Sequence, residues 1–287
     1  LNPYFLAPGS NQIVAAVGDV AGNVGYATNT VVMNIITNGE YLYNNAGAVT
    51  NISYSSSNYS ESIGLTWDAK GQVRSISTNG AEAEAFEYDA LGRRVKIISG
   101  SATNYLVYDG SELIAECGAD GSLTKSYVYG SGAGNILAMN VHSGGVVTTY
   151  WYLKDLQGTV YALADSSGNI VESYKFDSWG RVLGVYDGYW QPLGESAIGN
   201  RILFHGKEYS WKAGIYLNGA RWYDPVIGRF LSRDPGGVSG SLNEYEFCLS
   251  DPVNYVDPDG ESAQGVYDWL TQWAGDGYSK GGCAGWF

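Results

Sequence analysis

The chain repeats one short pattern of apolar and polar positions. Two aromatic or apolar residues are separated by one residue of any type, Asp or Asn follows directly, and Gly comes three positions later. The clearest copies are Tyr41-x-Tyr43-Asn44-x-x-Gly47, Leu65-x-Trp67-Asp68-x-x-Gly71, Phe86-x-Tyr88-Asp89-x-x-Gly92 and Tyr174-x-Phe176-Asp177-x-x-Gly180. With looser copies at Asp19, Asp109, Gly130 and Asp155, the turn positions follow at intervals of 20 to 25 residues. A repeat architecture is therefore the first prediction from the sequence.

Each copy predicts a β-hairpin. Residues i and i+2 of a strand share a face, so both aromatic side chains of a copy point to one side of the sheet. The Asp or Asn side chain bonds the backbone two residues on, and Gly supplies a positive φ, so these four residues form the turn. Alternating stretches such as Arg94–Ile98 and Thr159–Leu163 then return as the second strand.

One hairpin cannot bury its aromatic face alone, whereas stacked hairpins shield one another's rings. The predicted fold class is all-β, a strip of stacked antiparallel hairpins that coils into a shell-like wall. A β-sandwich of unrelated hairpins is the alternative. The predicted repeat turns are Asn44, Asp68, Asp89, Asp109, Asp155 and Asp177.

Composition agrees with short strands and tight turns, because 40 Gly and 24 Tyr beside 7 Pro are unusual in a helix-rich protein.

A net charge of −13 argues against nucleic acid as the main partner. No run of about 18 apolar residues predicts a membrane span. The sparse Cys117, Cys248 and Cys283 lack CxxC spacing, so neither a disulfide framework nor a zinc site is expected. The low Lys and Arg content is typical of secreted or surface β proteins.

Several segments resemble a known family. Tyr88–Arg94 and Phe176–Val182 resemble the YD repeats of Rhs proteins, tripartite-toxin C components and teneurins, and Lys154–Asn169 is similar to the family's final repeats. Four further segments resemble the Rhs repeat-associated core domain: Phe204–Tyr209, Gly214–Tyr216, Ala220–Pro225 and Gly228–Pro235. The pattern closes with Asn243-x-Tyr245-x-Phe247, Asp251-Pro252-x-Asn254 and Val256–Gly260. The similarity covers roughly residues 40 to 260.

The resemblance implies that the repeats coil into a hollow shell, that the core domain plugs one end, and that a C-terminal segment is kept inside. The predicted regions are an N-terminal strand segment (1–36), the YD-repeat strip (37–195), the core or plug (196–260) and a tail (261–287). The N-terminal segment is either a first repeat or the remnant of an Ig-like module, whose closing strands it resembles.

The tail is expected to contain a short amphipathic helix. Ser262 is placed to cap it, and Val266, Trp269, Leu270 and Trp273 follow helical spacing. We expect this element to pack back on the shell, or to dock onto a neighbouring copy.

The resemblance also implies chemistry near Gly260. Relatives cleave their own backbone just after the final Asp-Pro-x-Gly, using two aspartates as in an aspartic protease. By motif position these are Asp234 and Asp257, with Arg233 as a supporting charge. Two close carboxyl groups cannot both ionise cheaply, so one acts as acid and the other as base. Cleaving members carry Leu after the Gly, whereas this chain has Glu261.

Asp-Pro pairs also start turns, so a purely structural role stays open for both aspartates. Other chemistry has less support. His205 is interpreted as structural, and no Gly-x-Ser-x-Gly elbow predicts a serine hydrolase. Asp257-x-Asp259-Gly260 lacks the other positions of a calcium loop. No metal and no cofactor are expected.

The leading hypothesis is a secreted or surface-displayed bacterial Rhs/YD-repeat protein, a structural β shell that encapsulates or presents a C-terminal segment. The sequence leaves open whether it also acts on itself as an aspartic-type autoprotease, since Glu261 departs from the cleaving pattern, and no turnover of an external substrate is expected. The expected partners are its own C-terminal segment or neighbouring copies, and a cell-surface glycan or protein. The alternative is a self-assembling or adhesive extracellular protein without catalysis.

Overall fold

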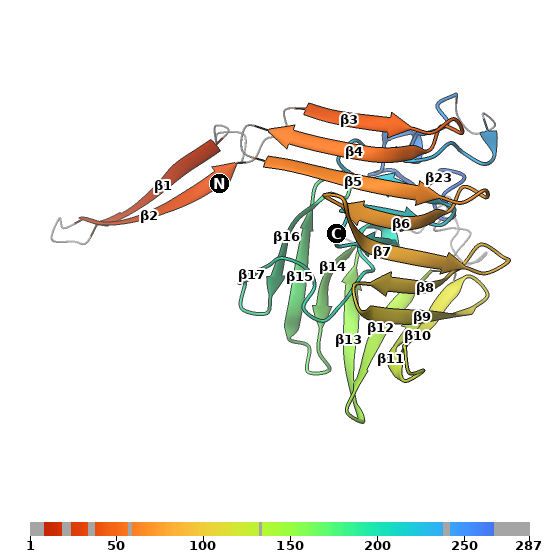
Figure 1. Ribbon diagram of the computed structural model, residues 1–287. Coiled ribbons are helices and arrows are strands. Elements are labelled where there is room, and N and C mark those ends of the chain that lie inside the picture. Colours follow the sequence, from red (N-terminus) through yellow and green to blue (C-terminus); the bar gives the residue numbers. More distant parts are fainter. Residues whose placement is uncertain are drawn as a thin grey trace, which may run out of the picture.

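The computed structural model describes residues 9–18, 24–33, 38–56, 59–131, 134–237 and 242–266, with side chains from residue 39 onward except 56–59. Within them, the largest element is one antiparallel sheet of 15 strands in which each strand pairs with the next in sequence (Figure 1). Its strands are β3 (Asn38–Tyr43), β4 (Val49–Ser56), β5 (Tyr59–Trp67), β6 (Val73–Thr78), β7 (Ala81–Tyr88), β8 (Arg94–Ser99), β9 (Ala102–Asp109), β10 (Glu112–Gly118), β11 (Leu123–Tyr129), β12 (Ile136–Ser143), β13 (Val146–Lys154), β14 (Val160–Ala164), β15 (Ile170–Phe176), β16 (Val182–Asp187) and β17 (Pro192–Leu193). The predicted all-β strip of stacked hairpins is confirmed.

Three smaller sheets accompany this strip. The first two strands pair only with each other, a second sheet has four short strands, and a third pairs two strands near the end of the described chain. Their bounds are β1 (Gly9–Gly18), β2 (Val24–Met33), β18 (Glu208–Ser210), β19 (Ile215–Asn218), β20 (Arg221–Asp224), β21 (Arg229–Phe230), β22 (Tyr255–Val256) and β23 (Gln264–Gly265). Two single 3-10 turns are η2 (Phe204–Gly206) and η4 (Cys248–Ser250).

The repeat turns share one hydrogen-bond pattern. In the Asp68 turn, the Oδ1 atom accepts the backbone N–H groups of Lys70 and Gln72 at 2.9 and 3.0 Å. Gly71 follows with a φ of +79°, which an L side chain adopts only under strain. The same pair of acceptor contacts occurs at Asn44, Asp89, Asp155 and Asp177, and also at Asp165 and Asp187.

Asp109 differs from the other predicted turn residues. It ends β9 and pairs directly with Glu112, so only Gly110 and Ser111 form the loop. Because Gly follows Asp immediately, the sequence forms a two-residue hairpin loop instead of the longer Asp-x-x-Gly turn.

An aromatic side chain replaces a missing ladder bond at successive repeat boundaries. Backbone pairing of β6 with β7 begins at Ser75 and Ala85, so the Val73 carbonyl has no partner on β7. The Tyr88 hydroxyl donates to this carbonyl at 2.8 Å. Equivalent bonds run from Trp67 Nε1 to the Val49 carbonyl, from the Tyr108 hydroxyl to the Arg94 carbonyl, and from the Tyr129 hydroxyl to the Leu113 carbonyl. Each donor directly precedes its turn and reaches back over the preceding hairpin.

The strip bends because its hairpins are irregular at the same place. Register shifts fall immediately before the second aromatic, as at Thr66/Trp67 in β5 and Glu87/Tyr88 in β7. A bulge of this kind bends a strand and increases its twist. In Figure 1 the strands β13 to β16 accordingly run steeply across the direction of β3 to β7.

The bent strip packs around the described residues of 196–237 and 242–260, which we call the core. Its inner face carries the buried side chains, such as Val73, Ile76 and Leu163, each 0% exposed. Strands far apart in the strip all contact the core. The contacts join Tyr41 and Tyr54 to Asp224, Glu84 to Ser210, Glu116 to Arg201, Tyr152 to Asn200, and Glu172 to the Ala197 amide. The core therefore lies against the inner face of the strip.

The described tail residues bear on where the expected helix begins. Gln264 and Gly265 form β23 and pair with Val256 and Tyr255, so no helix starts at Ser262. Val266, directly after β23, is helical. The rest of the expected helix, with Trp269, Leu270 and Trp273, lies outside the described residues, as does the turn at Asp19. In the described part of the chain, no helix has the length and apolar character needed to cross a membrane.

Replacing Tyr88 by Phe tests the inter-repeat bond. The Val73 carbonyl, on a residue 0% exposed, would lose its donor, so the free energy of unfolding is expected to fall by about 1–2 kcal/mol. Urea titration measures it. Tyr189→Phe is the matched control, because that side chain is 87% exposed and its change should cost under about 0.5 kcal/mol. Equal stability of the two variants would remove the role assigned to the hydroxyl.

Candidate functional site

The loop that ends at Gly260 is held by three donors from the core. Lys207 Nζ donates to the Pro258 carbonyl at 2.6 Å, and the Ala220 N–H donates to the Asp259 carbonyl at 2.8 Å. Arg221 Nε donates to the Gly260 carbonyl. Three successive carbonyl groups thus each have a donor, and we call this arrangement the Gly260 clamp. Ala220 lies in the tight turn between β19 and β20, and Arg221 is the first residue of β20.

Two glycines allow the clamp to close. A Cβ atom on Gly219 would overlap the Asp259 carbonyl, and one on Gly260 would overlap the Asn218 carbonyl. Both residues also have positive φ, +54° and +78°. Only glycine lets the two backbones approach this closely.

Arg221 brings the two predicted catalytic aspartates together. Its Nη2 atom lies 3.0 Å from Asp234 Oδ2 and 3.6 Å from Asp257 Oδ2. The guanidinium side chain is 3% exposed, and the carboxyl groups approach it from different segments of the core. The structure therefore places both aspartates at the clamp, joined through a buried cation.

Asp257 is the more deeply enclosed of the two. It is 2% exposed, and its Oδ1 atom accepts the N–H groups of Gly260 at 2.8 Å and Ser262 at 3.3 Å. Burial raises the pKa of the Asp257 carboxyl, although Arg221 opposes this effect. Asp257 is therefore suited to carry a proton at a higher pH than an exposed aspartate, and it bonds the amides on either side of the Glu261 nitrogen.

Among the described residues, Arg233 forms its ion pair with Glu244 and not with either aspartate. Its side chain is 57% exposed, and its Nε atom lies 3.6 Å from Glu244 Oε2. The cation between the two aspartates is Arg221. Glu261 is exposed, so its side chain lies outside the buried cluster of Arg221, Asp234 and Asp257. Its backbone N–H donates to Asp259 Oδ1 at 3.0 Å.

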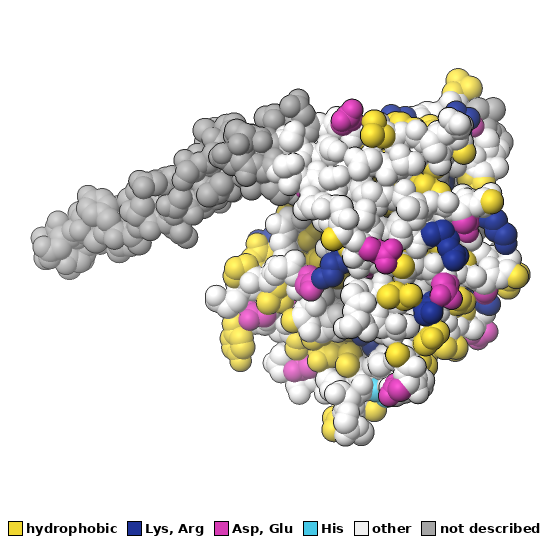
Figure 2. All heavy atoms as spheres, viewed as in Figure 1, with side chains coloured by type: hydrophobic (Ala, Val, Ile, Leu, Met, Phe, Trp, Pro, Cys, Tyr) yellow, Lys and Arg dark blue, Asp and Glu magenta, His cyan; other side chains and the backbone are white. Residues whose placement is uncertain are grey.

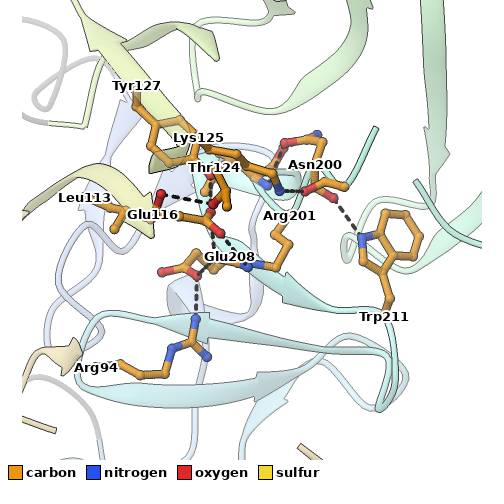
Figure 3. A network of polar contacts seen from close by, with 12 residues as sticks. Arg94, Leu113, Glu116, Thr124, Lys125, Tyr127, Asn200, Arg201, Glu208 and Trp211 are labelled. Atoms are coloured by element: carbon orange, nitrogen blue, oxygen red, sulfur yellow. Dashed lines mark hydrogen bonds and ion pairs between the residues drawn. The ribbon is translucent and has the colours of Figure 1, made fainter. Parts of the chain in front are cut away.

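A second buried network fixes the core to the strip (Figure 3). Arg201 Nη2 lies 3.0 Å from Glu116 Oε1 on β10 and 3.4 Å from Glu208 Oε2 on β18. Arg94 on β8 pairs with Glu208 as well, and the Tyr127 hydroxyl donates to Glu116. Burial alone would raise the pKa of Glu116, but Arg201 and Lys125 outweigh it and lower the pKa. Breaking one member of such a buried network costs several kcal/mol, so it holds the core in one position.

The imidazole ring of His205 is buried in the core. It is 7% exposed, its ring stacks on Phe204 at 4.0 Å, and neither ring nitrogen has a partner in the described part of the chain. Burial and the neighbouring Lys207 lower its pKa to about 3. The imidazole is therefore neutral near pH 7. Among the described residues, no group of three or more His, Cys, Asp or Glu side chains could hold a metal ion.

The sequence interpretation gave Lys207 no role, and it named Arg233 and not Arg221 as the charge beside the aspartates. Both lie in segments that resemble the core domain, but no local pattern distinguishes Arg221 from Arg233 or Arg229. The one local signal was Gly219 directly before Ala220 and Arg221, which indicates a tight turn.

Comparisons with known proteins agree with this fold. The Teneurin YD-shell family matches residues 27–121. The chain is 34% identical over 226 residues to the tRNA3(Ser)-specific nuclease WapA of Bacillus spizizenii, which covers 74% of this chain and 9% of that protein. It is 28% identical over 201 residues to the probable deoxyribonuclease RhsA of Dickeya dadantii, covering 68% and 13%. A crystal structure of TcdB2-TccC3 matches with a TM-score of 0.55 at 21% identity, over 88% of this chain and 15% of that one.

The bent strip with an enclosed core is thus the fold of a YD-repeat shell. The chain belongs to the Rhs/YD-repeat proteins, which are related to polymorphic toxins and to components of tripartite toxins, and the resemblance seen in its sequence is confirmed. It spans 9 to 13% of the length of the two relatives described above.

Replacing Gly219 by Ala tests the close approach in the clamp. Gly110 offers a matched control, because its φ is +58° but a Cβ there would meet nothing within 4 Å. We expect Gly110→Ala to lower the free energy of unfolding by about 1 kcal/mol and Gly219→Ala by at least about 3 kcal/mol. Urea unfolding of both variants gives the comparison. Equal losses would mean that backbone strain alone, and not packing against residue 259, requires glycine.

His205 predicts acid sensitivity. The unfolded chain binds a proton on this ring below about pH 6.5, whereas the folded chain does so only near pH 3. The stability contributed by the neutral ring is therefore complete above pH 6.5 and falls by about 1.4 kcal/mol per pH unit below it. Between pH 7 and 5, urea unfolding should show the wild type losing about 2 kcal/mol more than His205→Asn.

His142→Asn controls for the loss of an imidazole, since His142 lies only partly buried on β12. It should keep the pH dependence of the wild type. If His205→Asn keeps that dependence too, His205 is not the source of the acid sensitivity.

Proposed function

We propose that this chain is the closing section of a toxin-type YD shell, which holds a C-terminal segment and hydrolyses its own backbone between Gly260 and Glu261. One observation carries the proposal: a single buried guanidinium, Arg221, contacts the Gly260 carbonyl and both candidate aspartates. Hydrolysis needs a polarised carbonyl, a base for water and an acid for the leaving nitrogen, and the clamp gathers groups for all three.

The two carboxyl groups take different roles. Asp257 is the proton donor, because burial raises its pKa and its Oδ1 atom lies against the amides flanking the Glu261 nitrogen. Asp234, paired with Arg221 at 3.0 Å, is the base that removes a proton from the attacking water. Two carboxyl groups with unlike surroundings divide acid and base work in this way.

Glu261 is compatible with this chemistry. Cleaving relatives carry Leu at this position, yet the side chain here is exposed and does not enter the buried cluster. The change therefore alters the surface at the exit of the chain, while the buried groups around the bond stay the same.

The relatives support the toxin role of the longer shell. WapA is named as a tRNA nuclease and RhsA as a probable deoxyribonuclease, and TccC3 is named in a structure of the Photorhabdus luminescens Tc holotoxin pore. We propose that the enclosed partner is the C-terminal segment of the same chain, that other toxin components are further partners, and that the protein acts outside the cell that makes it. The face in Figure 2 shows Lys and Arg side chains interspersed with Asp and Glu, without a basic stripe.

Intact-mass measurement over time tests the cleavage. The wild-type chain should yield a fragment that ends at Gly260 and one that begins at Glu261. Asp257→Asn keeps a hydrogen-bond acceptor but cannot donate the proton, so cleavage should slow at least 100-fold. Asp251→Asn, in a turn of the core 6 residues before Asp257, is the control and should cut at the wild-type rate. A wild-type chain that stays intact, or Asp257→Asn cutting normally, would remove the catalytic part of the proposal.

A further inference from the structure

We infer that Arg221 is the oxyanion-binding residue of this site: its Nε–H activates the Gly260 carbonyl and stabilises the negative charge that forms on that oxygen during hydrolysis. The inference rests on the proposed cleavage and assigns the group that makes the bond reactive. It also separates Arg221 from Arg233, which the motif resemblance favoured.

Arg221 is fixed in place before any reaction. Its guanidinium carbon lies 3.6 Å from the centre of the Phe230 ring, so the cation stacks on an aromatic face. Nη1 donates to the Glu244 carbonyl at 3.1 Å, and Nη2 lies 3.0 Å from Asp234. The remaining donor, Nε–H, points to the Gly260 oxygen. A donor held in this way needs no reorganisation when charge develops, which is the condition for strong electrostatic stabilisation.

The groups at the Gly260 clamp and one water molecule account for every bond and proton in the proposed hydrolysis. Asp234 takes a proton from water, and the water oxygen bonds to the Gly260 carbon. The electron pair of the carbonyl moves onto its oxygen, where Arg221 Nε–H holds it. The bond from carbon to the Glu261 nitrogen then breaks, Asp257 gives its proton to that nitrogen, and Gly260 ends as a carboxylic acid that loses its proton.

Only an arginine fills this position. The guanidinium spreads one positive charge over three nitrogens in a fixed plane, so it can bind a carbonyl and a carboxylate in different directions. A lysine at residue 221 would bring three donors on a single nitrogen, which cannot reproduce the fixed planar set of donors on separate nitrogens. Arg221→Lys therefore keeps the charge and removes the directed Nε–H.

Selective isotope labelling isolates the bond in question. The sequence contains three Gly–Glu pairs, Gly39–Glu40, Gly194–Glu195 and Gly260–Glu261. With ¹³C-carbonyl glycine and ¹⁵N-glutamate, a carbonyl-to-amide NMR experiment on the full chain gives one signal for each pair. The Gly260 signal reports its hydrogen bond and disappears when the bond is cut, while the other two signals report that the first and last parts of the strip stay folded.

The comparison uses Arg221→Lys with Arg233→Lys as the rival site. Arg221→Lys should slow the disappearance of the Gly260 signal at least 100-fold, as expected for loss of one oxyanion donor. In the uncut Asp257→Asn background it should move the Gly260 carbonyl signal upfield, because the hydrogen bond is lost, and leave the other two in place. Arg233→Lys should change neither the rate nor the signal.

A second variant covers the case in which Arg221→Lys disturbs folding. Phe230→Leu removes the ring beneath the guanidinium and leaves all its donors, so cutting should slow by about tenfold or more while Asp257 and Asp234 are untouched. Wild-type rates in Arg221→Lys or in Phe230→Leu, or a loss of cutting in Arg233→Lys with no loss in Arg221→Lys, would overturn the inference.

The same experiments distinguish failure of the proposed cleavage from failure of the role assigned to Arg221. If the wild-type Gly260 signal never disappears, the cleavage is wrong, whatever the variants do. If the wild type cuts and the Gly260 carbonyl signal does not move in Arg221→Lys, the cleavage stands and the role of Arg221 is wrong.

Discussion

At the boundaries between the first repeats, a backbone carbonyl lacks a partner in the β-ladder, and the structure depends on how it is satisfied. The Tyr88 hydroxyl meets Val73, Tyr108 meets Arg94, and Trp67 meets Val49. A buried carbonyl without a donor is costly, so an aromatic with a polar tip is needed immediately before each turn. The aromatic with a polar tip therefore recurs at the same position of these hairpins. The register shift lies directly beside it, and these bulges bend the strip.

Bending turns the strip into a container for its own core. The inner face carries buried acids and tyrosines that an open sheet would expose, and residues 196–260 supply their partners, as Arg201 does for Glu116. Within the core, the turn between β19 and β20 lies against the loop that ends at Gly260. The arrangement around Arg221 thus depends on tertiary packing, since its members come from separate segments of the core.

The sequence predicted the features that depend on residues close together in the chain, namely the strands and turns of each hairpin. Aromatic spacing and Asp-x-x-Gly turns gave the strip, because one repeat contains the information for one hairpin. Asp109 could have been interpreted correctly, since Gly110 follows it directly. The partner of Asp234 could not be found in this way. Arg221 lies 13 residues before it and Arg233 lies next to it, and only the packing of β20 against the core loops decides between them.

Native-state hydrogen exchange tests most directly whether the strip encloses a seated core. The amide of Val49 donates to the Leu231 carbonyl and the amide of Val160 to that of Leu203, so both bonds join the strip to the core. If strip and core form one unit, these two amides exchange only through the global opening that also exposes the strands of the strip. Fast exchange of these two amides beside slow strand amides would show a core that is not docked, and would contradict the account.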